Sequence, residues 1–342
     1  MRIGVLTGGG DCPGLNAVIR AVVRRAERGF GDQVVGFLDG WRGVVEDDTV
    51  VLDVDACRGL LPRGGTVLGT SRLQPFAMED GVERARGTID RHGLDGLVVV
   101  GGEGTLSCAR GLHELGFPVV GVPKTIDNDI NATEMTFGFE TAIEIATEAI
   151  DRLHTTAESH DRVMVVEVMG RHVGHIAAWA GMAGGATVTL VPEEPFDIGE
   201  VCAVVRRRHD RGRFASVLVV AEGARPVEGT MDMPEDEVDA FGHVRLGGIA
   251  HRVADEIGRR TGFETRVTIL GHVQRGGTPT AFDRVLASRF GVAAVDAIHE
   301  GGLGTMTSLT AGKIVLVPLS EAVAEVKKLD SGLWETAKVF FA

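Results

Sequence analysis

The sequence predicts an α/β fold with open, mainly parallel sheets and helices on both faces. Short runs of Val, Ile and Leu alternate along the chain with segments of helical periodicity, and glycine-rich turns join the two. The runs are apolar throughout rather than at every second residue, which is the pattern of parallel strands buried on both faces. The chain of 342 residues has room for one large domain or two smaller ones, and two such sheets would account for its length.

The first half of the chain shows this alternation in order. A glycine-rich turn at residues 7–14 follows an apolar run and precedes a segment in which Leu15, Val18 and Val22 fall at helical spacing. We expect strands at residues 3–6, 96–100 and 119–123, and helices at 15–29, 106–116 and 141–156.

The second half continues the pattern and adds one segment of different character. Residues 224–248 are acidic and contain Pro and Gly, so we expect an exposed insertion there. A domain break is plausible near Gly138. The other expected strands are 162–170, 186–192, 216–223, 266–272 and 313–319, with a helix at 174–185 and further helices between the strands.

Composition excludes several functional classes. The net charge of −13 argues against nucleic acid as a partner, because phosphate backbones attract basic surfaces. No run of eighteen apolar residues predicts a membrane span, and the first residues lack the features of a signal peptide. The four cysteines form no CxxC pair, so we expect reduced thiols and a cytoplasmic protein.

Two glycine-rich turns, at residues 7–14 and 101–105, could bind an anion. Glycines let backbone amides approach a phosphate, and the helix that follows adds its positive end. Neither turn has the GxGxxG or GxxxxGK[ST] spacing, so each could equally be a tight strand-to-helix turn. Glu103 lies in the second turn, where a carboxylate beside phosphates calls for a cation such as Mg²⁺, although a first-turn helix acid is the simpler interpretation.

The stretch "VPKTIDNDI", residues 122–130, places a lysine and two aspartates after an apolar run. Asp127 and Asp129 are two residues apart, so on an extended chain they would share a face. One could accept a proton from a hydroxyl while the other leans toward a metal, with Thr125 and Asn128 holding the loop. The alternative is a turn built from Asx residues.

Basic side chains flank several predicted strands. Arginine is the usual residue for holding phosphate through two parallel hydrogen bonds. Any one of these side chains alone is more simply a solvated surface charge, but their recurrence beside glycines indicates phosphate binding. They are Arg162, Arg171, Arg266, His272 and Arg275.

Taken together, these motifs resemble those of the bacterial 6-phosphofructokinases, the phosphofructokinase A family. The matching segments are "GVLTGGGDCPGLNAVIR", "GGEGT", "PKTIDNDI", "TFGFETA", "VVEVMGRHVGHIA" and "ETRVTILGHVQRGGTPTAFDRVLASRFG", in the family's order over roughly residues 1–300. The resemblance implies transfer of the terminal phosphate of a nucleotide to the 1-hydroxyl of fructose 6-phosphate, a glycolytic reaction, with Mg²⁺ as cofactor and ATP as co-substrate.

The resemblance also implies a role for individual residues. Asp127 matches the general base, Thr125 and Asp129 support it, and Arg171 stabilises the moving phosphoryl group. Glu103 stands where the family more often has Asp and, with Asp129, would hold Mg²⁺. The nucleotide-binding positions are Gly10, Arg72, Leu73, Gly102, Glu103, Gly104 and Thr105. The sugar-phosphate positions are Thr125, Ile126, Asp127, Met169, Gly170, Arg171, Glu222, His272 and Arg275, together with Arg162 and Arg266, which family tetramers lend across a subunit interface.

Domain organisation follows from the same resemblance. We expect two Rossmann-like domains, with the nucleotide-binding domain formed by residues 1–138 and about 275–325. The fructose 6-phosphate-binding domain would comprise residues 139–274 and about 326–342. We expect a homotetramer that binds neither nucleic acid nor membrane.

Two positions bear on the phosphate donor, and they form a mixed ATP/diphosphate-type pattern. ATP-using members usually have glycine at the positions of both Gly104 and Lys124, whereas diphosphate-using members have Asp and Lys. A carboxylate at position 104 would crowd and repel the α-phosphate, whereas a flexible lysine at position 124 could swing aside. We therefore expect ATP as the donor, with a diphosphate-dependent enzyme as the alternative.

The sequence also bears on two other functional classes and on regulation. A dinucleotide-dependent dehydrogenase lacks support because GxGxxG is missing, and a non-catalytic nucleotide sensor would be expected to lose Asp127 or Glu103. Arg20 and Arg24 match arginines of the family's ADP effector site. Val54 and His154 replace two others, and "GRFAS" replaces a lysine-rich stretch, so we expect weak or absent activation by ADP.

Overall fold

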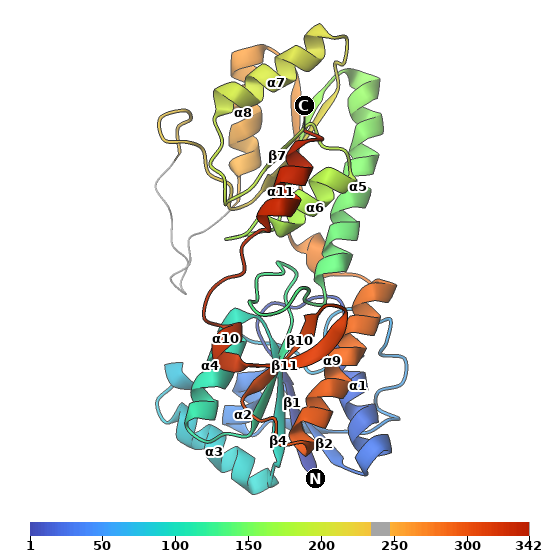
Figure 1. Cartoon of the computed structure of the whole chain (residues 1–342), viewed down its shortest axis with the longest axis vertical. Coiled ribbons are helices and arrows are strands. Elements are labelled where there is room, and N and C mark those ends of the chain that lie inside the picture. Colours follow the sequence, from blue (N-terminus) through green and yellow to red (C-terminus); the bar gives the residue numbers. More distant parts are fainter. Residues whose placement is uncertain (234–246, 342) are drawn as a thin grey trace. The chain divides into compact units, whose positions relative to one another are not determined.

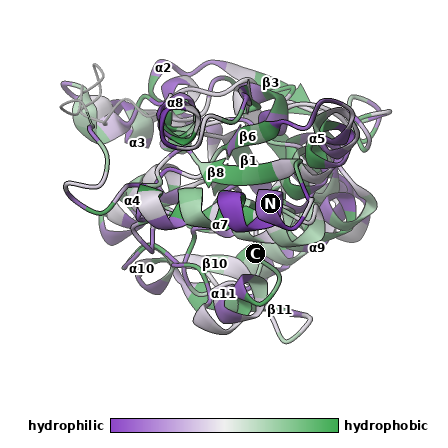
Figure 2. Ribbon diagram, turned by 90° about the horizontal axis from the view of Figure 1, so that it is seen from above, coloured by the Kyte–Doolittle hydropathy of each residue, from purple (hydrophilic) through white to green (hydrophobic). Residues whose placement is uncertain are grey.

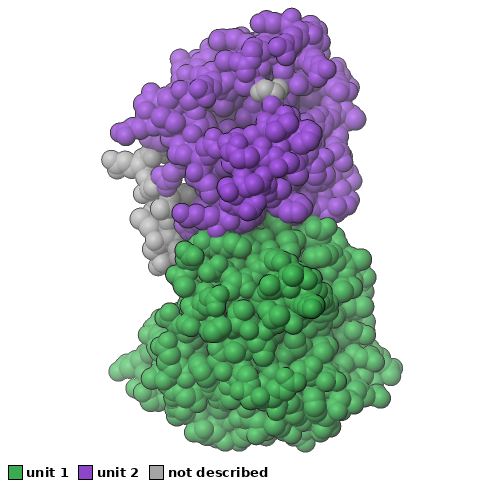
Figure 3. All heavy atoms as spheres, viewed as in Figure 1, with its two compact units in different colours: residues 1–141, 275–327 green, residues 142–274, 328–342 purple. Residues whose placement is uncertain are grey.

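The chain divides into two compact units in the computed structural model, which describes residues 1–233 and 247–341. The first unit comprises residues 1–141 and 275–327, and the second comprises residues 142–274 and 328–342 (Figure 3). Each unit is therefore built from two separate stretches of chain. No helix among the described residues is both long enough and apolar enough to cross a bilayer.

A seven-stranded sheet forms the centre of the first unit. Its strand order is β11-β10-β5-β4-β1-β2-β3, and neighbours from β10 to β2 pair in parallel. The two edge strands, β3 and β11, pair antiparallel with their neighbours. The strands are β1 Arg2–Thr7, β2 Gln33–Phe37, β3 Thr49–Leu52, β4 Gly96–Gly101, β5 Val119–Pro123, β10 Thr305–Thr310 and β11 Lys313–Pro318.

Helices cover both faces of this sheet because its central strands are apolar along their whole length. Every residue of β4 and β5 is buried. Figure 1 shows α1 and α9 on one side of the sheet and α2, α3 and α4 on the other. The helices are α1 Leu15–Arg25, which continues as a π-helical turn Ala26–Phe30, α2 Trp41–Glu46, α3 Gly81–His92, α4 Glu103–Glu114, α9 Ala281–His299 and α10 Leu319–Ala322, with a 3₁₀ turn at Pro75–Ala77.

The second unit has a smaller sheet of four parallel strands in the order β7-β8-β6-β9. Strand β8 is coloured as hydrophobic in Figure 2, and all residues of β6 and β8 are buried. Helices α7 and α8 share one apolar core with this sheet. The elements are β6 Val163–Val168, β7 Val188–Leu190, β8 Ser216–Ala221, β9 Thr265–Ile269, α5 Phe139–His160, α6 His175–Ala183, α7 Ile198–Asp210, α8 Ile249–Thr261 and α11 Ser331–Lys338, with a 3₁₀ turn at Gly271–Arg275.

The predicted α/β class with mainly parallel sheets and helices on both faces is confirmed. The last predicted strand is present as β11, although it runs antiparallel as an edge strand. The expected insertion at residues 224–248 is only partly described, since residues 234–246 lie outside the described part. Within the rest, Ala224 and Met231 are buried in the core of the second unit, so exposure of the whole segment was wrong.

Candidate active site

The polar segments of the first unit follow three neighbouring strands of the larger sheet. Strand β4 pairs with β1 on one side and with β5 on the other, and Gly101 lies opposite Pro123. Because parallel strands end at the same edge, the glycine turn after β1, the turn after β4 and the loop after β5 meet there. This edge of the sheet is the candidate active site of the first unit.

The glycine loop after β1 is held by contacts that leave little room for side chains. The Gly9 amide donates to the Ser71 carbonyl at 3.1 Å. A Cβ on Gly10 would collide with the guanidinium of Arg275, whose Nη1 also donates to the Asp11 carbonyl at 3.3 Å. Arg275, predicted from sequence as a sugar-phosphate contact, therefore lies beside the predicted nucleotide loop within the first unit.

The turn after β4 begins helix α4 at Glu103, and Gly102 occupies the position just before it. The Glu103 Oε1 atom accepts a hydrogen bond from the Ser107 hydroxyl at 2.8 Å, one helical turn further along. Thr105 is buried, and its side chain fills the space that Cβ atoms on Gly8 and Gly101 would need. The two glycine turns thus pack directly on each other through Thr105.

Gln74 was missed by sequence reasoning and sits against the donor-specificity position. Its Nε2 donates to the Gly104 carbonyl at 3.2 Å, and a Cβ on Gly104 would lie 3.4 Å from that nitrogen. A Cβ at position 104 would therefore be in ordinary van der Waals contact with Gln74. Arg72 and Leu73, the other predicted nucleotide contacts, precede Gln74 in the same loop.

Lys124 does not have the freedom that the sequence argument assumed. Its side chain is only 3% exposed, and Nζ donates to the Gly10 carbonyl inside the glycine loop. Burial lowers the pKa of the Lys124 ammonium below its ordinary value. The expectation that this lysine could swing aside was wrong, because the loop after β1 covers it.

The loop after β5 is not extended, which corrects a second expectation. Asn128 has a φ of 53°, in the left-handed region, so the chain turns between Asp127 and Asp129. The Asp127 amide donates to the Thr125 hydroxyl at 3.0 Å, and Asn128 Oδ1 accepts from the Thr136 amide at 3.0 Å. The two aspartates are therefore placed by a hydrogen-bonded turn, as in the alternative Asx interpretation, and Ile126 anchors it in the core.

Asp129 and Glu103 form a donor set that suits a magnesium ion. Burial raises the pKa of the Asp129 carboxyl, and the negative charge of Glu103 raises that pKa further. One carboxylate oxygen of Asp129, Oδ1, is buried and has no hydrogen-bond partner. A hard cation with oxygen ligands would satisfy that atom and remove the repulsion between the two acids.

Lys327 is a partly buried lysine that sequence reasoning missed. Its Nζ donates to Asn128 Oδ1 at 2.8 Å and to the carbonyls of Thr133 at 2.9 Å and Glu134 at 3.0 Å. Burial lowers the pKa of this ammonium to about 8. No local pattern could have indicated it, because 199 residues separate it from Asn128.

The second unit presents its predicted residues around the end of β6. The Glu222 amide donates to the Val168 carbonyl at 2.9 Å and the Gly223 amide to the Gly170 carbonyl at 3.1 Å. The Met169 amide donates a hydrogen bond to Oε1 of the buried Gln274 at 2.8 Å. The Met169–Gly170 segment, which leads into Arg171, is therefore held by hydrogen bonds with the segments that follow β8 and β9.

Three more predicted residues of this unit are Arg162, which directly precedes β6, Arg266, which lies in β9, and His272, which follows β9. Arg162 pairs with Glu264 at 3.0 Å, and Arg266 pairs with the same carboxylate. The two ion pairs lower the pKa of Glu264. His272 is exposed in the 3₁₀ turn that follows β9.

The predicted residues of the first unit come together as one group of Gly10, Glu103, Lys124, Asp127 and Asp129, which Arg275 joins. The second unit holds its predicted residues at opposite ends of its sheet. Near the ends of the strands lie Met169, Gly170, Arg171, Glu222 and His272, whereas Arg162 and Arg266 lie where β6 and β9 begin. Their roles stay predictions.

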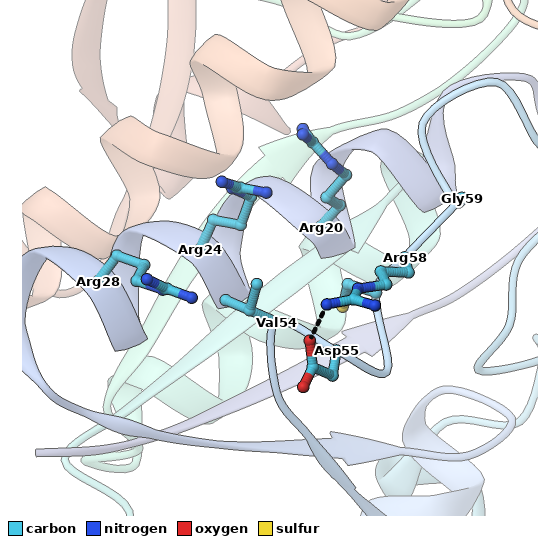
Figure 4. A pocket seen from close by; sticks show the side chains of 8 residues that line it. Arg20, Arg24, Arg28, Val54, Asp55, Arg58 and Gly59 are labelled. Carbon is cyan, nitrogen blue, oxygen red and sulfur yellow. Dashed lines mark ion pairs between the residues drawn. The ribbon is translucent and has the colours of Figure 1, made fainter.

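A separate cavity of about 320 Å³ in the first unit is rich in arginine. Figure 4 shows Arg20, Arg24 and Arg28 projecting from α1 and the turn after it, opposite Val54. Arg58 also lines the cavity and pairs with Asp55 at 3.0 Å. Arg28 and Arg58 were not anticipated from sequence.

Comparison with known proteins yields consistent similarities. The family model described as phosphofructokinase matches residues 2–298. The chain is 57% identical over its whole length, and over the whole relative, to a pyrophosphate--fructose 6-phosphate 1-phosphotransferase of Streptomyces coelicolor. It is 56% identical to an ATP-dependent 6-phosphofructokinase of Corynebacterium efficiens, covering 100% of this chain and 99% of that one.

A solved structure resembles the fold as well. The T-state phosphofructokinase of Pichia pastoris superposes with a TM-score of 0.83 at 35% identity, covering 94% of this chain. This chain spans 35% of the length of the Pichia chain.

Proposed function

The chain belongs to the phosphofructokinase family, and from this premise we propose that it transfers the terminal phosphate of ATP to the 1-hydroxyl of fructose 6-phosphate. The products are ADP and fructose 1,6-bisphosphate. The observation that carries the proposal is the meeting of two glycine turns, Glu103 and the Asp127–Asp129 loop at one edge of the larger sheet.

The chemistry needs a base, a phosphate cradle and positive charge. Asp127 takes the proton of the 1-hydroxyl, the oxygen bonds to the terminal phosphorus, and the bond from that phosphorus to its bridging oxygen breaks. Glycine turns at strand ends suit the phosphates of the donor. Phosphoryl transfer depends mainly on positioning and electrostatic stabilisation, so the arginine of the second unit, Arg171, is assigned to the charge of the moving group.

Mg²⁺ would be held by Glu103 and Asp129, and it would neutralise the charge of the donor phosphates when bound. The remaining work falls to the side chains of the chain itself. Met169, Gly170, Glu222 and His272 would bind the sugar phosphate. Arg162 and Arg266 would add positive charge across a subunit interface.

The donor assignment rests on position 104. Glycine there leaves space for the α-phosphate. An aspartate at this position would repel that phosphate, because two unit charges about 4 Å apart interact by roughly 4 kcal/mol at an effective dielectric near 20. The second candidate donor is diphosphate, which the burial of Lys124 in the glycine loop favours. A fixed ammonium there offers positive charge to a compact polyanion.

Assay of the purified chain with each donor tests the proposal. We expect turnover of fructose 6-phosphate with ATP and Mg²⁺, measured as fructose 1,6-bisphosphate formed. Turnover with diphosphate and none with ATP would assign the chain to the second candidate. Failure with both donors would overturn the proposed reaction altogether.

Three further properties belong to the proposal. We expect a homotetramer, in which the partly exposed Arg162 and Arg266 reach a neighbouring copy, and light scattering measures the mass. The four cysteines are all free, which supports a cytoplasmic enzyme with reduced thiols. Weak or absent activation by ADP is expected because Val54 stands opposite the arginines of α1.

A further inference from the structure

The loop that carries the predicted base needs support from outside itself. Asn128 and Ala132 both have φ angles in the left-handed region, at 53° and 58°. A residue with a Cβ is held there only when its surroundings determine the backbone. Within the loop, the Asn128 side chain bonds Thr136, which orders the turn but does not tie the loop to the rest of the unit.

Strand β10 supplies one such tie, because the Leu309 amide donates to the Thr133 hydroxyl at 3.0 Å and the Glu134 amide donates to the Leu309 carbonyl at 2.9 Å. One ammonium supplies a second tie. Lys327 Nζ has three N–H donors, and the structure gives each an acceptor in the loop: Asn128 Oδ1 at 2.8 Å, the Thr133 carbonyl at 2.9 Å and the Glu134 carbonyl at 3.0 Å. Along the chain, these acceptors lie on both sides of Asp129. The full use of the donors makes Lys327 a specific anchor, unlike a solvated surface lysine.

The backbone around Lys327 continues the same contact. The Lys327 amide donates to the Asp129 carbonyl at 2.9 Å, and Val326 pairs antiparallel with Ile130. The last segment of the first unit therefore contacts the loop through an isolated β-bridge and through the Lys327 backbone and side chain. The Asp127 amide donates a hydrogen bond to the Thr125 hydroxyl, and the next residue, Asn128, accepts one from Lys327. Asp127 therefore lies between two fixed points of the loop.

We infer that Lys327 is a positioning residue that holds the Asp127–Asp129 loop in its reactive geometry. It lies beyond residues 2–298, which the family model matches, and no motif of the sequence points to it. The inference rests on the proposed function, because it takes Asp127 as the base. A displacement of about 1 Å from a remote substitution costs about 10²-fold in rate.

The test compares Lys327→Met with Lys328→Met, the same substitution at the neighbouring exposed lysine. In Lys327→Met we expect kcat to fall about 10- to 100-fold, with KM for both substrates within about threefold of wild type. Hydrogen–deuterium exchange should rise in peptides covering residues 125–134. Lys328→Met should match wild type in both measurements.

Each result has a consequence. A folded Lys327→Met enzyme with wild-type kcat overturns the inference, as does unchanged exchange in residues 125–134. If Lys327→Met does not fold, Lys327→Gln keeps a shorter neutral donor, and the same two measurements decide. An inactive wild-type chain overturns the proposed function. In that case the exchange measurement still tests the contact, because hydrogen–deuterium exchange in residues 125–134 that is unchanged by Lys327→Met would show that Lys327 does not anchor the loop.

Discussion

Two sets of charged residues, one in each unit, differ in how the structure holds them. In the first, Lys124 is buried, Asp129 and Lys327 are partly buried, and both lysines bond to loops of the same unit. In the second, Arg162 and Arg266 are partly exposed and share the surface carboxylate of Glu264. The charged groups of the first set already have fixed partners before any ligand binds, whereas Arg162 and Arg266 would have to leave Glu264 to bind a phosphate.

The difference matches the tasks that we propose for the two groups. Groups that stabilise a transition state work best when they need no reorganisation at the moment of reaction. Arginines that recruit a phosphate can be paired with a carboxylate in the free protein, because the incoming phosphate replaces the Glu264 carboxylate as their partner. The comparison predicts large effects on turnover from the first unit and small effects on binding from the second.

The largest effect is expected from Asp127→Ser. Loss of a general base typically costs 10²–10⁴-fold, so kcat should fall in about that range while substrates still bind. Steady-state kinetics and calorimetric titration of fructose 6-phosphate measure the two quantities. Asp210→Ser, at the exposed end of α7, serves as the control. Retention of most of the turnover would show that the first unit does not carry the base.

Gly104→Asp should have the next largest effect. A Cβ at position 104 would lie 3.4 Å from Gln74 Nε2, which is an ordinary contact, so we expect the change to act mainly through its charge. Repulsion of roughly 4 kcal/mol at 4 Å predicts a loss of about 10²- to 10³-fold in kcat/KM for ATP. Gly104→Ala is the matched uncharged control. Equal losses in the two variants would mean that size rather than charge governs the donor.

Asp283 tests whether buried charge in the first unit costs stability. Burial raises its pKa from 3.8 to about 6, although Thr141 donates to its carboxylate from both its amide and hydroxyl. The folded chain therefore holds the proton more tightly, and this contribution, fully present below about pH 4, is lost as the pH rises through about 6. The loss amounts to about 3 kcal/mol.

Asp283→Asn keeps an acceptor for Thr141 and cannot titrate. Urea unfolding from pH 4 to pH 7 should show the wild type losing free energy of unfolding relative to this variant. Parallel curves for the two proteins would contradict the raised pKa.

The smallest effect is expected from Glu264→Gln. It releases Arg162 and Arg266 from ion pairs of a kind worth about 0–1 kcal/mol. KM for fructose 6-phosphate should fall by up to about fivefold with kcat unchanged, and added salt should reduce the gain. Glu200→Gln, on the exposed face of α7, provides the control. A higher KM would indicate that Glu264 orients the arginines instead of competing for them.

The strands and motifs were predictable because the signals that define them are local. Apolar runs such as β4 and β5 bury both faces, and such runs indicate parallel strands wherever they occur. The glycine turns and the Asp127–Asp129 pair follow strand ends directly, so their shared edge followed once the strands were parallel.

What the sequence by itself determined is therefore the fold class, the central strands of both sheets with the helices that follow them, and the family whose motifs the chain carries. The strands β2, β3 and β10 were not anticipated. Only the tertiary structure decided that Lys124 is enclosed by the glycine loop, that Arg275 packs on Gly10 and that Lys327 anchors the loop of Asp127. The bonded residues are far apart in the sequence: Lys124 and Gly10 are separated by 114 positions, Arg275 and Asp11 by 264, and Lys327 and Asn128 by 199. Local patterns report on neighbours along the chain, whereas burial and hydrogen bonding of a long side chain depend on which distant segment returns to cover it.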